Sequence, residues 1–390
     1  MNNTLVVYRV LQLFVPLCIY FLIMRTLPPL LYGELLIPLS LASFLGNVFN
    51  QNLDNYFSAT LFGKRLKRRH TLIFSIIFGY KAVSFFLLFL IWSIAAYINS
   101  SWIWFFAIYT AMSTIFIPHF YIAVLNRYEL LLTGFIAEKL LIITFIVFFL
   151  DTQNYHLLNM VFCFGVLTNI ALTLACLKLS LGVRINPKDM DASVLVRKYK
   201  RYLKDAKFFI VGKATQVHTD FFKFLIGVIF GNAAVVVVDF LEKVVNTQRA
   251  VFSVVNNHFQ YVKMSYEFTK KMLCYLLALS SMLIALNVVF LPIIAPILNA
   301  ALSVSYYQAM AYSLILFATP VITVVGQNYS LRTLSKIFVA KSQIQANLII
   351  LVILSSLYFF AASQELYLLV PFVAESILAL FIYRNFSRYG

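Results

Sequence analysis

Charged residues are scarce in this sequence, and the shortage excludes an ordinary soluble fold. Only 12% of the 390 residues are Asp, Glu, Lys or Arg, whereas 62% are hydrophobic. A soluble domain carries about a quarter charged residues and about half apolar ones. Apolar runs of about 20 residues recur along the chain, which is enough to cross a hydrocarbon core as helix. Strands of a membrane barrel would alternate instead. The sequence therefore predicts an all-α polytopic membrane protein.

The sequence also lacks the usual residues of metal, redox and soluble-enzyme chemistry. Its cysteines lie in apolar runs without a CxxC pair, and His119, His218 and His258 do not have metal-ligand spacing. The GxxxxGK phosphate loop, the GxSxG elbow and the HExxH motif are absent. We therefore expect no enzyme, no metal and no cofactor, and leave a coupling ion, H⁺ or Na⁺, open. The cysteines are Cys18, Cys163, Cys176 and Cys274.

Acidic residues are much rarer than basic ones, and the formal net charge is +17. In a soluble protein this excess would suggest nucleic acid as a partner. In a membrane protein, however, cytoplasmic loops collect Lys and Arg, and anionic headgroups attract them. We therefore expect the lipid bilayer as a partner and no nucleic acid. The N-terminus has no basic region or small-residue cleavage site, so the first helix is expected to be retained.

The apolar runs predict about twelve spanning helices. Basic residues gather in every second connection, with Lys139 counted among them, and Arg25 alone departs from this pattern. This alternation places both ends in the cytoplasm, and we expect a multi-pass protein of the bacterial cytoplasmic (inner) membrane, N-in and C-in. The predicted helices cover 5–26, 35–61, 71–98, 102–125, 130–150, 156–179, 208–230, 233–261, 272–298, 304–330, 344–363 and 366–386.

The longest connection divides the chain near its midpoint. We predict a basic cytoplasmic linker over 181–207, which lies on the inner leaflet as an amphipathic helix. An N-terminal lobe over 1–180 precedes it and a C-terminal lobe over 208–390 follows it, each of about six helices. The segments 50–53 and 256–259 resemble one another faintly, and an even helix count per lobe would make such a repeat parallel.

Polar residues inside the predicted spans mark a candidate cavity. They recur three or four positions apart, so each set occupies one face of its helix. A polar stripe of this length must face protein or water, because lipid cannot satisfy it. The stripes contain Asp239, Glu242, Asn246, Arg249, Ser253, Asn256 and Gln260; Lys213, Gln216, Asp220 and Lys223; Ser40, Ser43, Asn47, Asn50, Gln51, Asp54 and Ser58; and Arg9 with Gln12.

A plainer interpretation stays open for several of these charges. Asp239 with Lys243, and Asp220 with Lys223, have the spacing of ion pairs within one helix, which would only neutralise charge during insertion. Lys81 is expected to extend to the cytoplasmic interface, so that its replacement by Ala has little effect. For Glu375, helix packing and function are both open.

Three features resemble the polysaccharide-transporter branch of the multidrug/oligosaccharidyl-lipid/polysaccharide (MOP) exporter superfamily, the Wzx-type flippases. The turn over 25–34 contains Tyr32-Gly33, as family members often do at this place. The segment 220–232 is similar to their seventh helix, with its Asp and its Gly-containing end. The two-lobe plan with a basic linker covers nearly the whole chain. The sequence departs from the family where Val238-Asp239 replaces the usual Gly-x-Tyr.

The resemblance implies a MATE-like fold and alternating access, with an undecaprenyl-diphosphate-linked oligosaccharide (an O-antigen or other surface polysaccharide repeat unit) as cargo. It also implies a polysaccharide polymerase and chain-length machinery as partners. Arginine suits the diphosphate because its guanidinium binds phosphate in bidentate geometry. The residues assigned are Arg249, Lys223 and Arg9 for the diphosphate; Asn47, Asn50, Gln51, Asn246 and Asn256 for the glycan; and Asp220, Asp239, Glu242 and Asp54 for charge balance or a coupling ion.

Two other functions stay open at this point. One is another secondary transporter of the superfamily, such as a drug or cation exporter. Its organic cations would favour an acidic cavity with few fixed positive charges, and Lys223 and Arg249 speak against that. The other is a membrane enzyme of envelope polysaccharide synthesis, which would need outer catalytic residues, whereas the predicted outer connections are very short.

Overall fold

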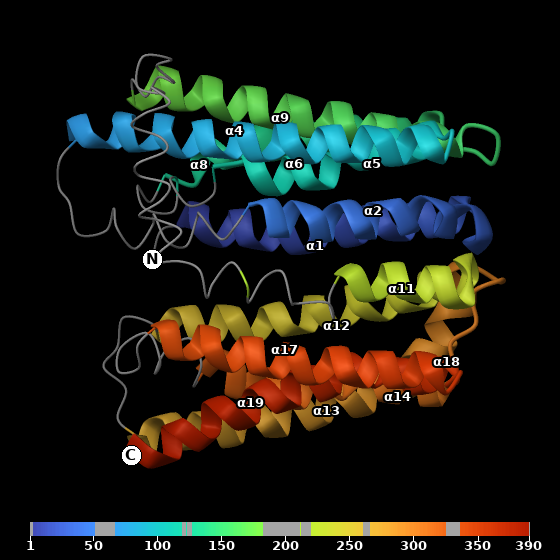
Figure 1. The fold of residues 1–390 in the computed structure, drawn as a ribbon, viewed down its shortest axis with the longest axis vertical. Coiled ribbons are helices and arrows are strands. Elements are labelled where there is room, and N and C mark those ends of the chain that lie inside the picture. The colour runs from blue at the N-terminus through green and yellow to red at the C-terminus, as the bar shows by residue number, and fades with distance from the viewer. Residues whose placement is uncertain are drawn as a thin grey trace. The chain divides into compact units, whose positions relative to one another are not determined.

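The computed structural model describes residues 3–50, 67–118, 122, 127–181, 211, 220–259, 266–324 and 336–389, with side chains for most of them. The regular structure within these ranges is entirely helical (Figure 1). Seven of the described helices are long and apolar enough to cross a membrane, and four shorter apolar helices accompany them. The protein is therefore a multi-pass helical membrane protein, as its composition predicted.

The chain groups into two compact units. Unit 1 contains Met1–Leu27 and Glu34–Ala214, and unit 2 contains Pro28–Gly33 and Thr215–Gly390. The predicted linker over 181–207 falls almost wholly outside the described residues, so the predicted lobe boundaries stay a prediction. Helix α2 begins in unit 2 and continues in unit 1.

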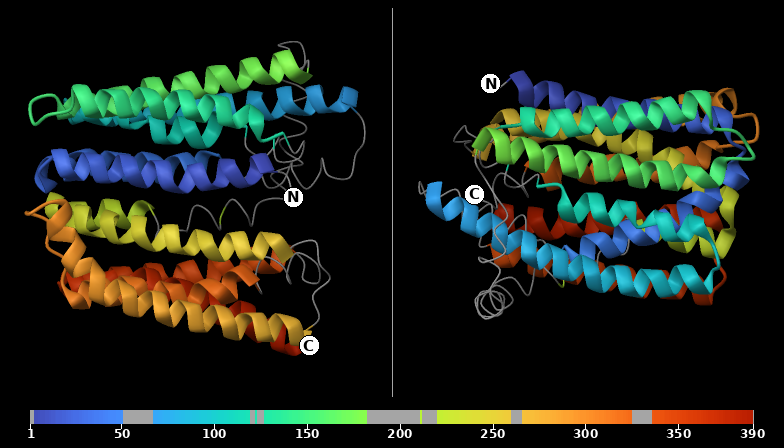
Figure 2. Two further views of the ribbon diagram at one scale, coloured as in Figure 1. Left: turned by 180° about the vertical axis from the view of Figure 1, so that it is seen from behind. Right: turned by 90° about the horizontal axis from the view of Figure 1, so that it is seen from above.

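The described part of unit 1 contains six successive helical segments, with α5 and α6 together counted as one (Figures 1 and 2). The break between α5 and α6 falls at Ile108, whose ψ of −14° departs from regular α-helix. Trp92 stabilises this region, because its indole N–H donates to the Trp104 carbonyl at 2.7 Å. The elements are α1 (Asn3–Thr26), α2 (Pro29–Phe49), α4 (Lys67–Ile98), α5 (Trp102–Ala107), α6 (Tyr109–Phe116), α8 (Glu129–Phe148), the short turn η1 (Tyr155–Leu157) and α9 (Leu158–Leu181).

Unit 2 also contains six successive helical segments within its described residues, with α14 and α15, and α18 and α19, each counted as one. Gly231 joins the first two at a φ of +89°, a backbone conformation that glycine adopts without strain. Ser305 begins α14 with a capping box, its hydroxyl accepting from the Gln308 backbone. The elements are α11 (Asp220–Phe230), α12 (Asn232–Phe259), α13 (Tyr266–Leu298), α14 (Tyr306–Ser313), α15 (Ile315–Pro320), α17 (Lys336–Phe359), α18 (Gln364–Leu368) and α19 (Val370–Tyr389).

The short segment Pro28–Gly33 is held in unit 2 by two contacts. Tyr32 donates a hydrogen bond from its hydroxyl to Asp239 Oδ2 at 3.3 Å. Gly33 approaches the backbone of Asn232 so closely that a Cβ atom there would lie 2.2 Å from the Asn232 carbonyl oxygen. Glycine is required at this position because no side chain fits between the two backbones.

One predicted boundary and one loop assignment were wrong for identifiable reasons. The second span was predicted over 35–61, but α2 begins at Pro29, and the predicted end lies outside the described residues. Proline at the first helical position is favourable because its missing N–H has no helical partner there. Lys139 was counted with the cytoplasmic loops, whereas it lies inside α8 with its side chain 16% exposed. Its partner on the same helix, Glu138, makes this position tolerable within an apolar span.

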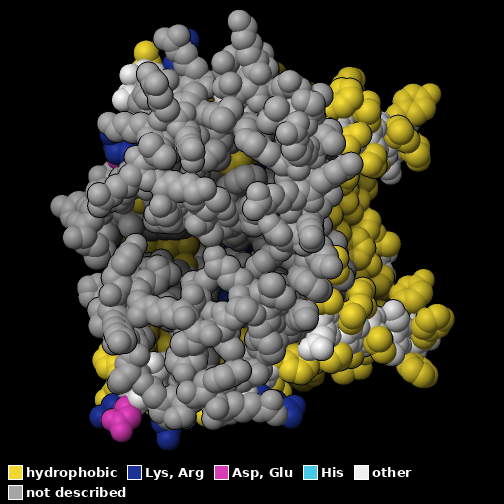
Figure 3. All heavy atoms as spheres, turned by 60° about the vertical axis from the view of Figure 1, so that its left-hand side comes forward, with side chains coloured by type: hydrophobic (Ala, Val, Ile, Leu, Met, Phe, Trp, Pro, Cys, Tyr) yellow, Lys and Arg dark blue, Asp and Glu magenta, His cyan; other side chains and the backbone are white. Residues whose placement is uncertain are grey.

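Large apolar side chains cover the outside of the helices. Tyr97, Trp102, Phe148 and Phe360 are each more than two-thirds exposed. Figure 3 shows hydrophobic side chains gathered along one edge of the molecule over the described residues. Lipid tails satisfy such side chains as well as a protein core does, so this surface fits a bilayer.

Candidate functional site

Helix α12 brings most of the predicted charged residues together in unit 2. Asp239 is 1% exposed, although it lies in a membrane protein where an isolated carboxylate would be costly. Lys223, on α11, lies with its Nζ 3.4 Å from Asp239 Oδ1 and 3.0 Å from Glu242 Oε2. One ammonium thus bridges two carboxylates that are separated by about one turn of α12.

The bridge has further hydrogen bonds on each side. The Tyr32 hydroxyl donates to the second oxygen of Asp239, and the Asn246 amide donates to Glu242 Oε1 at 3.1 Å. Both carboxylates therefore keep at least two partners in the described structure. We call Lys223, Asp239 and Glu242 the lysine triad; its formal charge is −1 when all three groups are ionised.

A second ion pair lies about two turns further along α12. Arg249 Nη2 donates to both oxygens of Glu375, on α19, at 2.7 and 2.8 Å. The Arg249 side chain is 28% exposed and that of Glu375 is 9% exposed. The sequence identified Arg249 but left Glu375 open, because the two residues lie 126 positions apart and no local pattern links them.

Tyr312 connects the two charged groups in space. It lies on α14 and is 6% exposed. It is close enough to Glu242, Lys223, Arg249 and Glu375 to interact electrostatically with each of them. The lysine triad and the arginine pair therefore lie near one another in unit 2, and we call them together the unit 2 cluster, which contains three carboxylates and two cations. Four helices of unit 2 supply its charged groups and this phenol: α11, α12, α14 and α19.

Uncharged polar residues extend this cluster toward α13. Gln248 and Asn287 exchange two amide hydrogen bonds of 2.7 and 2.8 Å, and Asn287 also donates to the Ser313 hydroxyl at 3.0 Å. The sequence analysis missed Asn287 and Ser313 because each stands alone in an apolar run. Their pairing becomes visible only when α12, α13 and α14 pack together.

Unit 1 holds a different buried polar cluster that the sequence analysis also missed. Glu138 on α8 is 5% exposed and forms an ion pair with its neighbour Lys139. Asn169 on α9 donates to Glu138 Oε2 at 2.6 Å and accepts from the Thr173 hydroxyl at 3.1 Å. Gly134 lies against this network, and a Cβ there would come within 2.4 Å of Asn169 Oδ1. The signal available in the sequence was a charged pair within an apolar run.

The remaining predicted site residues are described to different extents. Asn47 and Asn50 lie at the end of α2 and are half-buried. The helices that carry Arg9, Asp220 and Asn256 are described, but these side chains lie outside the described part. Gln51 and Asp54 also lie outside it, so their roles stay predictions. The alternative pairing of Asp239 with Lys243 is wrong, because Asp239 pairs with Lys223 across two helices.

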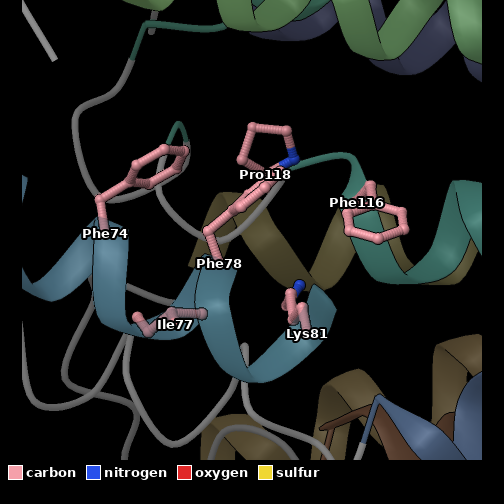
Figure 4. A pocket seen from close by; sticks show the side chains of 6 residues that line it. All are labelled: Phe74, Ile77, Phe78, Lys81, Phe116 and Pro118. Atoms are coloured by element: carbon pink, nitrogen blue, oxygen red, sulfur yellow. The ribbon is translucent and has the colours of Figure 1, made fainter. Parts of the chain in front are cut away.

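The expectation for Lys81 was wrong as well. Its side chain is 2% exposed and does not extend to a membrane interface. Phe74 and Phe78, on the preceding turns of α4, and Phe116, at the end of α6, enclose it instead (Figure 4). The snorkelling rule assumes a free path along the helix surface, and these aromatic rings close that path.

Comparison with solved structures identifies the fold. The chain is similar to an inward-facing conformation of a multidrug resistance MATE family transporter of the MOP superfamily, with a TM-score of 0.63 and 12% identity over 94% of this chain and 95% of the other. An outward-facing conformation of such a transporter has a TM-score of 0.58 and 12% identity, over 99% of this chain and 94% of the other. A structure of MATE in the bent conformation has a TM-score of 0.56 and 12% identity, over 100% of this chain and 98% of the other.

No sequence-family profile matches the chain, and no curated protein matches it by sequence. The predicted MATE-like MOP fold is nevertheless confirmed by the structural likeness over nearly the whole chain. An identity of 12% establishes the shared fold and leaves the cargo to be argued from this chain's own residues.

Proposed function

We propose that the protein is an alternating-access transporter that flips an undecaprenyl-diphosphate-linked oligosaccharide from the cytoplasmic to the external leaflet of the bacterial cytoplasmic membrane. The observation that carries the proposal is the buried cluster of unit 2, where Lys223 and Arg249 are held by carboxylates from other helices. Structures with this fold include inward-facing and outward-facing conformations, which supports alternating access.

The ion pairs suit a cargo that carries negative charge. An empty site with two bare cations in a membrane would be costly, and Asp239, Glu242 and Glu375 remove that cost. A diphosphate can take the place of these carboxylates, because its oxygens accept from guanidinium and ammonium groups in the same geometry. Binding then exchanges one set of anions for another, and the free energy change stays small enough for release on the other side.

The displaced carboxylates supply a route for coupling. A carboxylate that loses its cation in a site of low dielectric constant takes up a proton more readily. Asp239, Glu242 and Glu375 can therefore bind H⁺ or Na⁺ when cargo holds the cations. We assign Asp220 and Asp54 to the same coupling role. We assign Arg9 to the cations that bind the diphosphate. The same exchange needs no cofactor.

Amide side chains suit the glycan portion of the cargo. Asn246 lies exposed beside the lysine triad, and Asn47 and Asn50 are half-buried on α2. Each amide donates and accepts hydrogen bonds, which sugar hydroxyls require. Gln51 and Asn256 complete this set in the proposal. We further propose that both chain ends lie in the cytoplasm and that a polymerase with its chain-length machinery uses the flipped product outside.

A second candidate is an exporter of organic cations. The observation that favours it is the balance of the unit 2 cluster, where three carboxylates (Asp239, Glu242 and Glu375) accompany two cations (Lys223 and Arg249). When all five groups are ionised, the net charge of the cluster is −1, which would attract an organic cation. Two of the solved neighbours are multidrug resistance transporters.

Deletion of the gene in its native cell separates the two candidates. A flippase predicts that intact lipid-linked repeat units accumulate and surface polysaccharide disappears, with unchanged resistance to cationic compounds. Arg249→Ala and Lys223→Ala should fail to restore the polymer, whereas Lys139→Ala, a control at a half-buried, ion-paired lysine of unit 1, should restore it. Normal surface polymer together with greater sensitivity to organic cations would instead establish the exporter.

A further inference from the structure

Tyr312 carries a hydroxyl group for which the unit 2 cluster provides no hydrogen bond. The residue is 6% exposed and lies in the last turn of α14. Among the residues that the structure describes, the Tyr312 hydroxyl has no hydrogen-bond partner, whereas the Tyr32 hydroxyl donates to Asp239. A largely buried hydroxyl without a partner costs stability, and phenylalanine would fill the same space without that cost. The hydroxyl is therefore a candidate contact for a group that the cluster receives.

A chain of amide hydrogen bonds holds the end of α14 against α12. Ser313, the residue after Tyr312, accepts from the Asn287 amide at 3.0 Å. Asn287 in turn exchanges two amide hydrogen bonds with Gln248, which directly precedes Arg249 on α12. The position of Tyr312 is therefore fixed at the level of Arg249, so its hydroxyl is part of a well-defined arrangement.

Tyr312 lies near both cations of the cluster, which are themselves separated along α12. Lys223 is bound at Glu242, and Arg249 lies about two turns further along the helix, on the order of 10 Å. Tyr312 is close enough to Glu242 and Lys223, and also to Arg249, to interact electrostatically with each of them. A phosphate that moved from one cation to the other would come within reach of the phenol.

The carboxylates of the cluster already have donors and do not need the Tyr312 hydroxyl. Both oxygens of Asp239, of Glu242 and of Glu375 accept from another side chain. A diphosphate brings more acceptor oxygens than two cations can serve, and a phenol O–H adds a hydrogen bond without adding charge. The charged group of an organic cation offers no acceptor at all. The unused donor therefore matches an anionic ligand better than a cationic one.

We propose that Tyr312 is a further cargo-binding residue of unit 2, whose hydroxyl donates a hydrogen bond to a phosphate oxygen of the cargo while Lys223 or Arg249 holds that phosphate. The inference rests on the proposed function, because that function makes a polyprenyl diphosphate the cargo. The role belongs to the hydroxyl and not to the ring. Removal of the hydroxyl should therefore weaken binding and leave the fold at least as stable as before.

Binding to the purified full-length protein tests this role without a transport assay. Undecaprenyl diphosphate and tetraphenylphosphonium are the probes; thermophoresis gives their affinities, and thermal unfolding in the same detergent gives stability. Tyr312→Phe should weaken undecaprenyl diphosphate about tenfold, which is 1.4 kcal/mol, with an unchanged or higher unfolding temperature. Tyr32→Phe is the matched control, since it removes a hydroxyl that already has a partner. It should lower the unfolding temperature slightly and bind undecaprenyl diphosphate as wild type does.

Two charge variants separate this inference from the proposed function. If Lys223→Ala and Arg249→Ala weaken undecaprenyl diphosphate while Tyr312→Phe binds it as wild type, the inference is overturned and the proposed function stands. A loss that appears in Tyr312→Leu but not in Tyr312→Phe assigns the contact to the ring, which also overturns the inference. Weaker binding by Tyr312→Phe together with a clearly lower unfolding temperature makes the hydroxyl structural and has the same consequence. Wild-type protein that binds tetraphenylphosphonium but not undecaprenyl diphosphate overturns both.

Discussion

The two units neutralise buried charge in different ways. In unit 1, Glu138 pairs with Lys139, its immediate neighbour on the same helix. In unit 2, Lys223 reaches Asp239 across 16 positions, and Arg249 reaches Glu375 across 126. A pair within one helix persists however the helix packs, which suits a structural role. Pairs between helices exist only while those helices stay together, so their charges become available when the packing changes. The contrast explains why we place the exchange between carboxylates and cargo phosphates mainly in unit 2.

The largest expected effect comes from Arg249→Ala, which leaves Glu375 buried without its cation. Transport should be abolished, and the free energy of unfolding should fall by about 2–3 kcal/mol, below the full cost of a broken buried pair because Arg249 is partly exposed. Surface polysaccharide in complemented cells and thermal unfolding in detergent measure the two effects. The double variant Arg249→Ala/Glu375→Ala should recover stability without recovering transport. Recovery of both would mean that the pair is structural, like that of unit 1.

Lys223→Ala tests the lysine triad in the same way. Asp239 and Glu242 then face each other without the ammonium that bridges them, and like charges at this distance repel. We expect transport to fall at least about tenfold and stability by about 1–3 kcal/mol. Lys223→Arg should keep a substantial part of both, because it preserves the charge. Normal transport by an inserted, folded Lys223→Ala protein would contradict the binding assignment.

Gly134→Ala should affect the structural cluster of unit 1. The added Cβ would lie 2.4 Å from Asn169 Oδ1 and 2.6 Å from Thr173 Oγ1, so these side chains must move away from Glu138. A loss of about 1–3 kcal/mol in unfolding free energy is expected from overpacking. Transport per folded molecule should change less than about twofold. Gly165→Ala is the milder control, since its nearest neighbour is Glu138 Cγ at 3.2 Å. A selective loss of transport in Gly134→Ala would give the Glu138 cluster a direct role in transport.

The smallest expected effect is that of Tyr32→Phe. It removes one hydrogen bond of 3.3 Å to Asp239, while Lys223 still holds the other oxygen. A net contribution of about 0.5–1 kcal/mol is typical for such a bond. Thermal unfolding should show this decrease, and surface polysaccharide should stay near the wild-type level. A decrease as large as that of Lys223→Ala would place Tyr32 within the triad.

Sequence patterns predicted the elements that depend on local spacing. The stripe of α12 follows from a period of three and four, so Asp239, Glu242 and Arg249 could be identified directly. Their partners could not, because pairing with Lys223 and Glu375 depends on which helices pack together. Lys81 shows the opposite failure, since a sound local rule predicted an exposed side chain and distant Phe116 closed the path.

The membrane fold was predictable because apolar length alone decides whether a helix can span. The breaks within helices were not predictable, since nothing in the sequence around Ile108 indicates the break between α5 and α6. Lys139 was assigned to a loop because charge usually marks loops in such chains. The predicted helix over 130–150 nevertheless contained both Lys139 and its partner Glu138, so the error concerned only the count of loop charges.

The segment Pro28–Gly33 limits how the polypeptide can be divided. A fragment that starts at Thr215 would contain every helix of unit 2 but would lack these six residues, which come from the first tenth of the chain. Asp239 would lose the hydroxyl of Tyr32, and the backbone at Asn232 would lose the close cover of Gly33. If the two halves are produced separately, the C-terminal half therefore lacks part of unit 2. The N-terminal half must supply the segment Pro28–Gly33 to restore these contacts.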